Sequence, residues 1–201
     1  MTEMGKPYEP PAREGDYELP RNASLEEFWR WLGRDLVMNT TRGALAEFLV
    51  ALAVDALDGL QEGWASHDIT MGNDTTLEVK TSGYLQSWPQ KRRTTPTFDV
   101  GRKTGWDRVT GDYIDDKKRW SDVYVFCLHH HQEKATLDPL VLSQWTFFVL
   151  STERLDKKLG DQKSIGLSKL KALGAEEVFF DGIAEAVRKV APPVSARRSV
   201  S

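Results

Sequence analysis

The chain has 201 residues, of which 40% are hydrophobic and 28% charged, and its formal net charge is −3. This composition is that of a globular domain with a substantial core, and the net negative charge argues against a protein that coats nucleic acid indiscriminately. The single cysteine, Cys127, excludes an internal disulfide and favours a reducing, cytoplasmic setting. No apolar run is long enough to cross a bilayer, so no membrane partner is expected.

Composition along the chain predicts one domain between two tails. Residues 1–22 combine prolines, glycines and charges with little apolar content, which predicts a flexible N-terminal arm. Residues 191–201 are rich in serine and arginine and predict a flexible C-terminal tail. We expect residues 23–190 to form a single domain between them.

The first predicted element is a short helix over about residues 25–36. Ser24 followed by Glu27 is a capping-box signature, in which each side chain satisfies a backbone N–H at the helix start. Aromatic side chains at helical spacing follow, and they predict a packing face.

A second helix is predicted over residues 43–57, capped by one of the two threonines before it. Its residues are nearly all apolar, which predicts burial on all sides. Glu47 is the one charged residue in its first three turns, and an unpaired buried carboxylate costs several kcal/mol. A metal ion or Lys80 would stabilise it; a salt bridge to Arg42 or a partly exposed position would serve equally.

Two short strands joined by a polar turn at residues 72–74 come next, and they carry the most informative residues. The first strand holds Asp68, and the second holds the triplet Glu78-Val79-Lys80. Side chains alternate along a strand, so Glu78 and Lys80 share a face, and strand pairing can bring Asp68 beside them. Two carboxylates suit Mg2+, which needs few protein ligands, and a nearby lysine can hold or deprotonate a bound water.

Two other groups of candidate metal ligands have simpler explanations. Asp74 belongs to a strong turn signal, so we prefer Asp68 as the ligand. His129 and His131 would share a face at a strand end, but zinc requires more than two ligands and no third is evident. A polar transition from strand to loop explains the histidines better than a zinc site.

Polar and basic residues follow the lysine. Ser82, Tyr84 and Gln86 alternate with other residues and could line the face of Lys80, where Gln86 would orient water or touch phosphate. A polar strand edge is the alternative. Further on, the run Lys91-Arg92-Arg93 could bind backbone phosphates, or it could be a solvated loop.

The rest of the chain predicts the remaining elements of an α/β fold. Residues 101–119 read as a long, glycine-punctuated loop that could close over a substrate. Strands are expected at 97–100, 122–128 and 144–150, and helices at 153–159, 168–173 and 176–190. The order predicts an α/β three-layer sandwich, with a mixed central sheet flanked by helices.

The acids and the lysine resemble the PD-(D/E)xK nuclease superfamily, which has a restriction endonuclease-like fold. The matching residues are Asp68, Glu78 and Lys80, and Glu47 resembles the helix glutamate that reaches the metal site in many members. The resemblance covers roughly residues 40–150 and implies the same α/β core.

The resemblance implies a Mg2+-dependent nuclease, in which Mn2+ can substitute, acting on DNA with RNA not excluded. Asp68, Glu78 and the Val79 carbonyl would hold the cation, Glu47 would bind or steady it, and Lys80 would position the attacking water. Cleavage of both strands would imply a homodimer. The alternative functions are a catalytically silent nucleic-acid-binding or assembly module of a defence or repair complex on the same fold, and a structural protein without nucleic-acid contact.

Overall fold

The computed structural model describes residues 23–57, 66–107, 110 and 112–193, with only the backbone described at 106 and 107. The predicted N-terminal arm and most of the predicted C-terminal tail lie outside the described residues. The chain divides into two units, Met1–Asp35 and Leu36–Ser201, each described by itself.

In the first unit, α1 (Leu25–Leu32) begins at the predicted capping box. The Glu27 N–H donates to Ser24 Oγ at 3.1 Å, and the Ser24 N–H donates to the Glu27 carboxylate at 2.7 Å. The helix ends at Leu32, about four residues earlier than predicted, and Gly33 follows as its C-cap. The sequence therefore marked the start of α1 better than its end.

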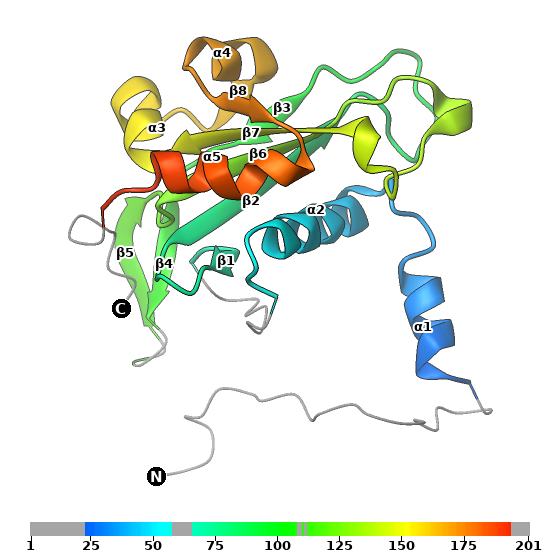
Figure 1. Cartoon of the computed structure of the whole chain (residues 1–201), viewed down its shortest axis with the longest axis horizontal. Helices are drawn as coiled ribbons and strands as arrows, with labels where there is room; N and C mark the ends of the chain where they lie inside the picture. Colours follow the sequence, from blue (N-terminus) through cyan, green and yellow to red (C-terminus); the bar gives the residue numbers. More distant parts are fainter. Residues whose placement is uncertain (1–22, 58–65, 108–109, 111, 194–201) are drawn as a thin grey trace. The chain divides into compact units, whose positions relative to one another are not determined.

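The second unit is built on a five-stranded mixed sheet of order β1-β2-β6-β7-β9. Its strands are β1 (Ile69–Thr70), β2 (Thr76–Gly83), β6 (Val123–His129), β7 (Trp145–Ser151) and β9 (Glu176–Val178). β2 and β6 run parallel, and the other neighbours are antiparallel (Figure 1). The predicted α/β class and mixed central sheet are confirmed.

Helices cover both faces of this sheet, as predicted. α2 (Asn39–Ala53) and α5 (Ile183–Val190) pack on the face to which Leu77 and Val79 of β2 point. α3 (Thr152–Leu159) and α4 (Leu167–Ala172) pack on the other face, together with a small sheet of β3 (Thr97–Asp99) and β8 (Ser164–Gly166). Figure 1 shows α2 and α4 on opposite sides of β2.

The helix α2 differs from its prediction in its start and in its burial. It begins at Asn39, before the threonines expected to cap it, and Met38 caps it without a side-chain hydrogen bond. Only one stripe of the helix meets the sheet, so Phe48 and Leu52 remain about half exposed. The prediction of burial on all sides is wrong, because a helix at the outside of a layered fold has one covered face.

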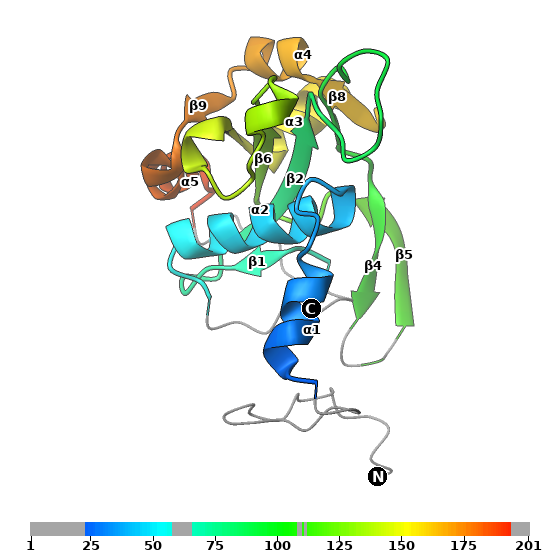
Figure 2. The same cartoon turned by 90° about the vertical axis from the view of Figure 1, so that its right-hand side faces the viewer.

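Two later segments also differ from prediction. Residues 101–119 contain a hairpin, β4 (Lys103–Asp107) and β5 (Asp112–Lys118), which projects from the body of the unit (Figure 2). Residues 176–190 contain β9, a 3-10 turn (Phe180–Gly182) and α5 instead of one helix. Short 3-10 turns also occur at Lys134–Thr136 and Leu142–Gln144. β5 and β9 are themselves mostly polar, and their backbone pairing with a neighbouring strand, not local propensity, makes them strands.

None of the helices in the described ranges combines the length and the apolar character that a bilayer crossing requires.

Candidate functional site

The site begins where β1 leaves the edge of β2. The Asp68 N–H donates to the Leu77 carbonyl at 3.0 Å, and Asp68 Oδ2 accepts from the Val79 N–H at 2.6 Å. The Asp68 side chain thus takes the place of a backbone acceptor, because β1 is too short to continue the ladder. Asp74, by contrast, has a positive φ of 63° in the turn between the strands, which agrees with its interpretation as a turn residue.

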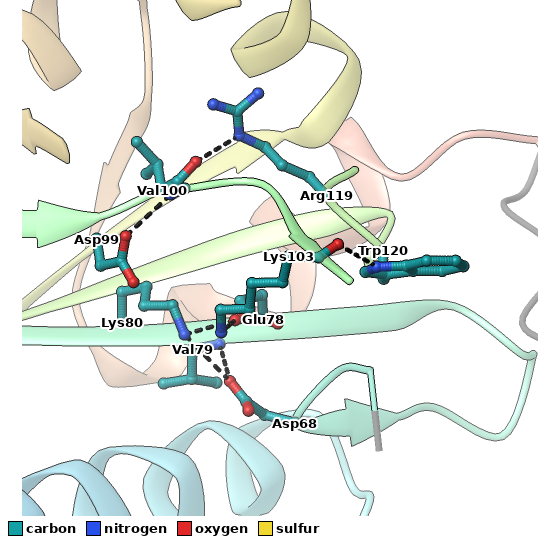
Figure 3. A network of polar contacts seen from close by, with 10 residues as sticks. Asp68, Glu78, Val79, Lys80, Asp99, Val100, Lys103, Arg119 and Trp120 are labelled. Carbon is teal, nitrogen blue, oxygen red and sulfur yellow. Dashed lines mark hydrogen bonds and ion pairs between the residues drawn. The ribbon is translucent and has the colours of Figure 1, made fainter. Parts of the chain in front are cut away.

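The carboxylates of Asp68 and Glu78 meet at Lys80. Lys80 Nζ lies 2.5 Å from Glu78 Oε1 and 4.0 Å from Asp68 Oδ2 (Figure 3). The side chain of Glu78 is only 4% exposed, whereas that of Asp68 is 26% exposed and opens to solvent. Asp68 lies in a bend just before β1, not within the strand as predicted, and the structure still brings its carboxylate to the acid–lysine triplet of β2.

Lys103 of β4 is a fourth member of this group, and the sequence did not reveal it. Its Nζ donates to Glu78 Oε1 at 2.9 Å, so one carboxylate oxygen is shared by two ammonium groups (Figure 3). No local motif marks this lysine, because its partner Glu78 lies 25 residues earlier in the sequence and only the tertiary fold brings the two together. We refer to Asp68, Glu78, Lys80 and Lys103 as the carboxylate–lysine cluster.

The charged groups of the cluster change one another's pKa values. Burial raises the pKa of Asp68, and the negative charge of Glu78 raises it further; Lys80 and the Val79 N–H oppose this rise. Burial by itself would lower the pKa of Lys103, but the charge and hydrogen bond of Glu78 outweigh it and the pKa is raised. The two carboxylates thus repel one another at a partly buried position, and the positive charges of the lysines stabilise them.

This donor set fits a hard divalent cation. Asp68 and Glu78 supply carboxylate oxygens from two different segments, and Val79 supplies a third oxygen. The N–H and C=O of one strand residue point to the same side, so the Val79 carbonyl faces the edge on which Asp68 lies. Across the described residues no three Asp, Glu, His or Cys side chains form a metal-binding group. Mg2+ commonly uses one or two carboxylates and keeps several waters, so this set suffices.

Glu47 does not form a group of three metal-binding carboxylates with Asp68 and Glu78. It is only partly buried on α2, which agrees with the alternative of a partly exposed position and not with full enclosure. Burial raises the pKa of the Cys127 thiol, and the charges of Glu47 and Asp68 raise it further. Cys127 packs in the core on the α2 side of the sheet.

Gln86 has a packing role that the sequence did not predict. The buried Gln86 Oε1 accepts from Arg42 Nη2 at 3.0 Å, and its Nε2 donates to the Gly83 carbonyl at 3.2 Å. These contacts tie the segment after β2 to α2, away from the carboxylate–lysine cluster. The expectation that it orients a water beside Lys80 finds no support in this geometry.

The other polar residues after Lys80 also hold the fold. Ser82 Oγ accepts from the Thr97 N–H at 3.2 Å and so joins β2 to β3. Tyr84 is half-buried and packs against the core on the side of α3 and α4. Neither side chain has a recorded contact with the cluster.

The basic run after β2 lies at the surface. Lys91, Arg92 and Arg93 are all exposed, as both the phosphate-binding and the solvated-loop interpretations require. Arg93 Nη2 donates to the Gln132 carbonyl at 3.3 Å, which attaches this loop to the segment after β6.

The histidine run is a transition from strand to loop. His129 is buried, stacks on Trp145 with ring centroids 4.7 Å apart, and pairs with Gln144 Oε1 at 3.2 Å. The other two histidines of the run each form a hydrogen bond with a threonine, His130 with Thr146 and His131 with Thr136. Burial lowers the pKa of His129 to about 4, so it is neutral near pH 7.

A scan of protein-family models finds no match to this chain, and a search of curated proteins finds none. The carboxylate–lysine cluster is the feature from which function is inferred.

Proposed function

We propose that this chain is a Mg2+-dependent nuclease with a restriction endonuclease-like fold, and that DNA is its substrate. The observation that carries the proposal is the convergence of Asp68 and Glu78, from separate segments, on the ammonium of Lys80. Two carboxylates can hold a hard divalent cation, and a lysine beside them can act on a metal-bound water, which suits metal-assisted phosphodiester hydrolysis. The resemblance to the PD-(D/E)xK superfamily rests on the same three residues.

In this proposal Asp68, Glu78 and the Val79 carbonyl hold Mg2+, with Mn2+ as a substitute. When bound, the ion would polarise a phosphate oxygen and lower the pKa of water. The hydrogen bond from the Val79 N–H orients Asp68 and keeps one of its oxygens at the strand edge. Burial of Glu78 gives the second carboxylate a fixed position.

Lys80 positions the attacking water and stabilises charge that develops on the phosphate. Its side chain is 18% exposed, so it reaches the cluster from within the fold and still meets solvent. Lys91, Arg92 and Arg93 would contact flanking phosphates, which places the nucleic acid without reading its sequence.

The test uses purified protein with plasmid DNA and Mg2+ or Mn2+. The wild type should cut, and Lys80→Ala should lose at least about a hundredfold in rate, the scale of a positioned acid–base group. Lys158→Ala, which removes an exposed lysine of α3, should cut like the wild type. Equal cutting by wild type and Lys80→Ala at matched melting temperatures would refute the mechanism.

One observation favours the second candidate, a silent nucleic-acid-binding or assembly module. Lys80 and Lys103 both neutralise Glu78, so the cluster also satisfies its own charges as a structural ion-pair network. A gel shift without cleavage on duplex, single-stranded and junction DNA would support that candidate. Absence of both Mg2+ binding by calorimetry and a gel shift would leave a structural protein.

A further inference from the structure

Glu78 is held by two lysines that reach it in different ways. Lys80 lies two residues away on the same strand and is 18% exposed, whereas Lys103 comes from β4 and is 52% exposed. Both ammonium groups form an ion pair with the same oxygen, Oε1, at 2.5 and 2.9 Å, and that of Lys103 also donates a hydrogen bond to it. Lys103 therefore lies on the solvent side of a carboxylate that is itself almost fully buried.

The backbone of Lys103 is clamped, which makes this contact a built feature of the fold. Trp120 Nε1 donates to the Lys103 carbonyl at 2.8 Å (Figure 3). Gly105 lies so close to the Trp120 ring that a Cβ there would collide with it. Lys118 Nζ lies 4.0 Å from the centre of the same ring, on the partner strand of the hairpin. The indole thus holds the backbone of Lys103 in place, while its side chain is half exposed and reaches Glu78.

We propose that Lys103 is an internal counter-ion that occupies the approach to the cation position and is displaced when the cation binds. The inference deepens the proposed nuclease function and rests on its metal site. A cation shared by Asp68 and Glu78 must compete for Glu78 Oε1, which two ammonium groups already share. Lys103 is the group that yields, because it is the more exposed of the two and is not part of β2.

A second carboxylate is available to the displaced lysine. Asp99, at the end of β3, lies on the same side of β2 as the side chains of Lys80 and Lys103 (Figure 3). Asp99 is exposed, and its Oδ1 accepts from the Gly101 N–H at 2.9 Å. The ammonium can therefore leave Glu78 without losing all of its compensating charge.

The experiment measures Mn2+ affinity by isothermal titration calorimetry without nucleic acid. Lys103→Met keeps the length of the side chain and removes its charge, and it should bind Mn2+ roughly three- to tenfold more tightly than the wild type. Lys103→Arg keeps the charge and should bind about as weakly as the wild type. Lys117→Met removes an exposed lysine of β5 in the same hairpin, and its affinity should change by less than about twofold.

Unchanged or weaker Mn2+ binding by Lys103→Met would overturn the inference, as would an equal gain in Lys117→Met. Failure of every protein to bind Mn2+ would overturn it too. Cleavage is scored separately. If the wild type cuts DNA but Lys103→Met gains no affinity for Mn2+, the counter-ion role is refuted and the proposed nuclease function stands. Tighter Mn2+ binding by Lys103→Met, with no cleavage by the wild type, would support the counter-ion role and remove the nuclease.

Discussion

Asp68 Oδ2 and the Val79 N–H are joined at 2.6 Å, so one carboxylate serves both the edge of the sheet and the proposed cation site. The same bond turns the side chain of Asp68 toward the strand that carries Glu78 and Lys80. A functional role and a structural role therefore overlap in this residue, and substitutions have to be chosen to separate them.

Asp68→Asn should separate the two roles, because the amide oxygen can still accept from the Val79 N–H. We expect its unfolding free energy to stay within about 1 kcal/mol of the wild type, while Mn2+ affinity falls at least tenfold. Asp68→Ala should lose the same affinity and also about 1–2 kcal/mol of stability. Denaturant titration and calorimetry measure the two effects, and equal stability losses in both variants would contradict the assigned hydrogen bond.

Glu78→Gln should destabilise the fold, because it leaves Lys80 and Lys103 facing each other without their shared anion. We expect a loss of about 1–3 kcal/mol, less than for a fully buried pair because both lysines reach solvent. Adding Lys103→Met should recover part of the loss, since it removes one of the two uncompensated charges. A double-mutant cycle by urea denaturation measures this coupling, and strictly additive effects would show that the two groups do not interact.

Lys103→Met should also change the kinetics of cleavage in two opposite directions. The half-saturating Mg2+ concentration should fall by roughly three- to tenfold, as for Mn2+ binding. The KM for DNA should rise by a similar factor, because an ammonium displaced from Glu78 is free to meet a phosphate. Initial rates over a grid of Mg2+ and DNA concentrations give both values, and parallel changes of the two constants would contradict displacement.

Gly105→Ala should disturb the clamp that holds Lys103. A methyl group there collides with the Trp120 ring, so the hairpin must shift, at a cost of about 1–3 kcal/mol. Gly72→Ala is the matched control, because a Cβ at that turn glycine meets nothing within 4 Å. Thermal melts of both variants make the comparison, and equal melting temperatures would argue against close packing of Trp120 on Gly105.

His129 should make stability depend on pH below neutrality. Its folded-state pKa of about 4 lies below its ordinary value of 6.5, so the unfolded chain binds the proton more readily. The contribution of neutral His129 to the free energy of unfolding is fully present above pH 6.5. It falls as the pH drops toward 4 and levels off below pH 4. The loss is on the order of 3–4 kcal/mol at about 1.4 kcal/mol per pKa unit.

His129→Phe keeps an aromatic ring against Trp145 and removes the titrating group. Urea denaturation of this variant between pH 7 and pH 4 should show a smaller loss than the wild type, and His131→Gln, at a partly buried histidine outside the Trp145 stack, is the control variant. Parallel curves for wild type and His129→Phe would assign the pH dependence to other groups.

Local patterns predicted the central elements well. Strands β6 and β7 are continuous apolar runs covered on both faces, and such runs are recognisable without knowing their partners. The capping box of α1 and the turn before β2 are encoded within four residues. The failures are the β4–β5 hairpin and β9, where polar residues form strands because a neighbouring strand supplies the hydrogen bonds.

The sequence by itself determined the α/β class, the β1–β2 hairpin and the shared face of Glu78 and Lys80. Alternation along a strand is a local property of the backbone, so no tertiary contact is needed to recognise it. Only the tertiary structure decided that Lys103 joins Glu78, that Gln86 turns to Arg42, and that Glu47 stays outside a three-carboxylate group. Those outcomes depend on how segments far apart in the chain pack against one another, and no spacing within a segment specifies such contacts.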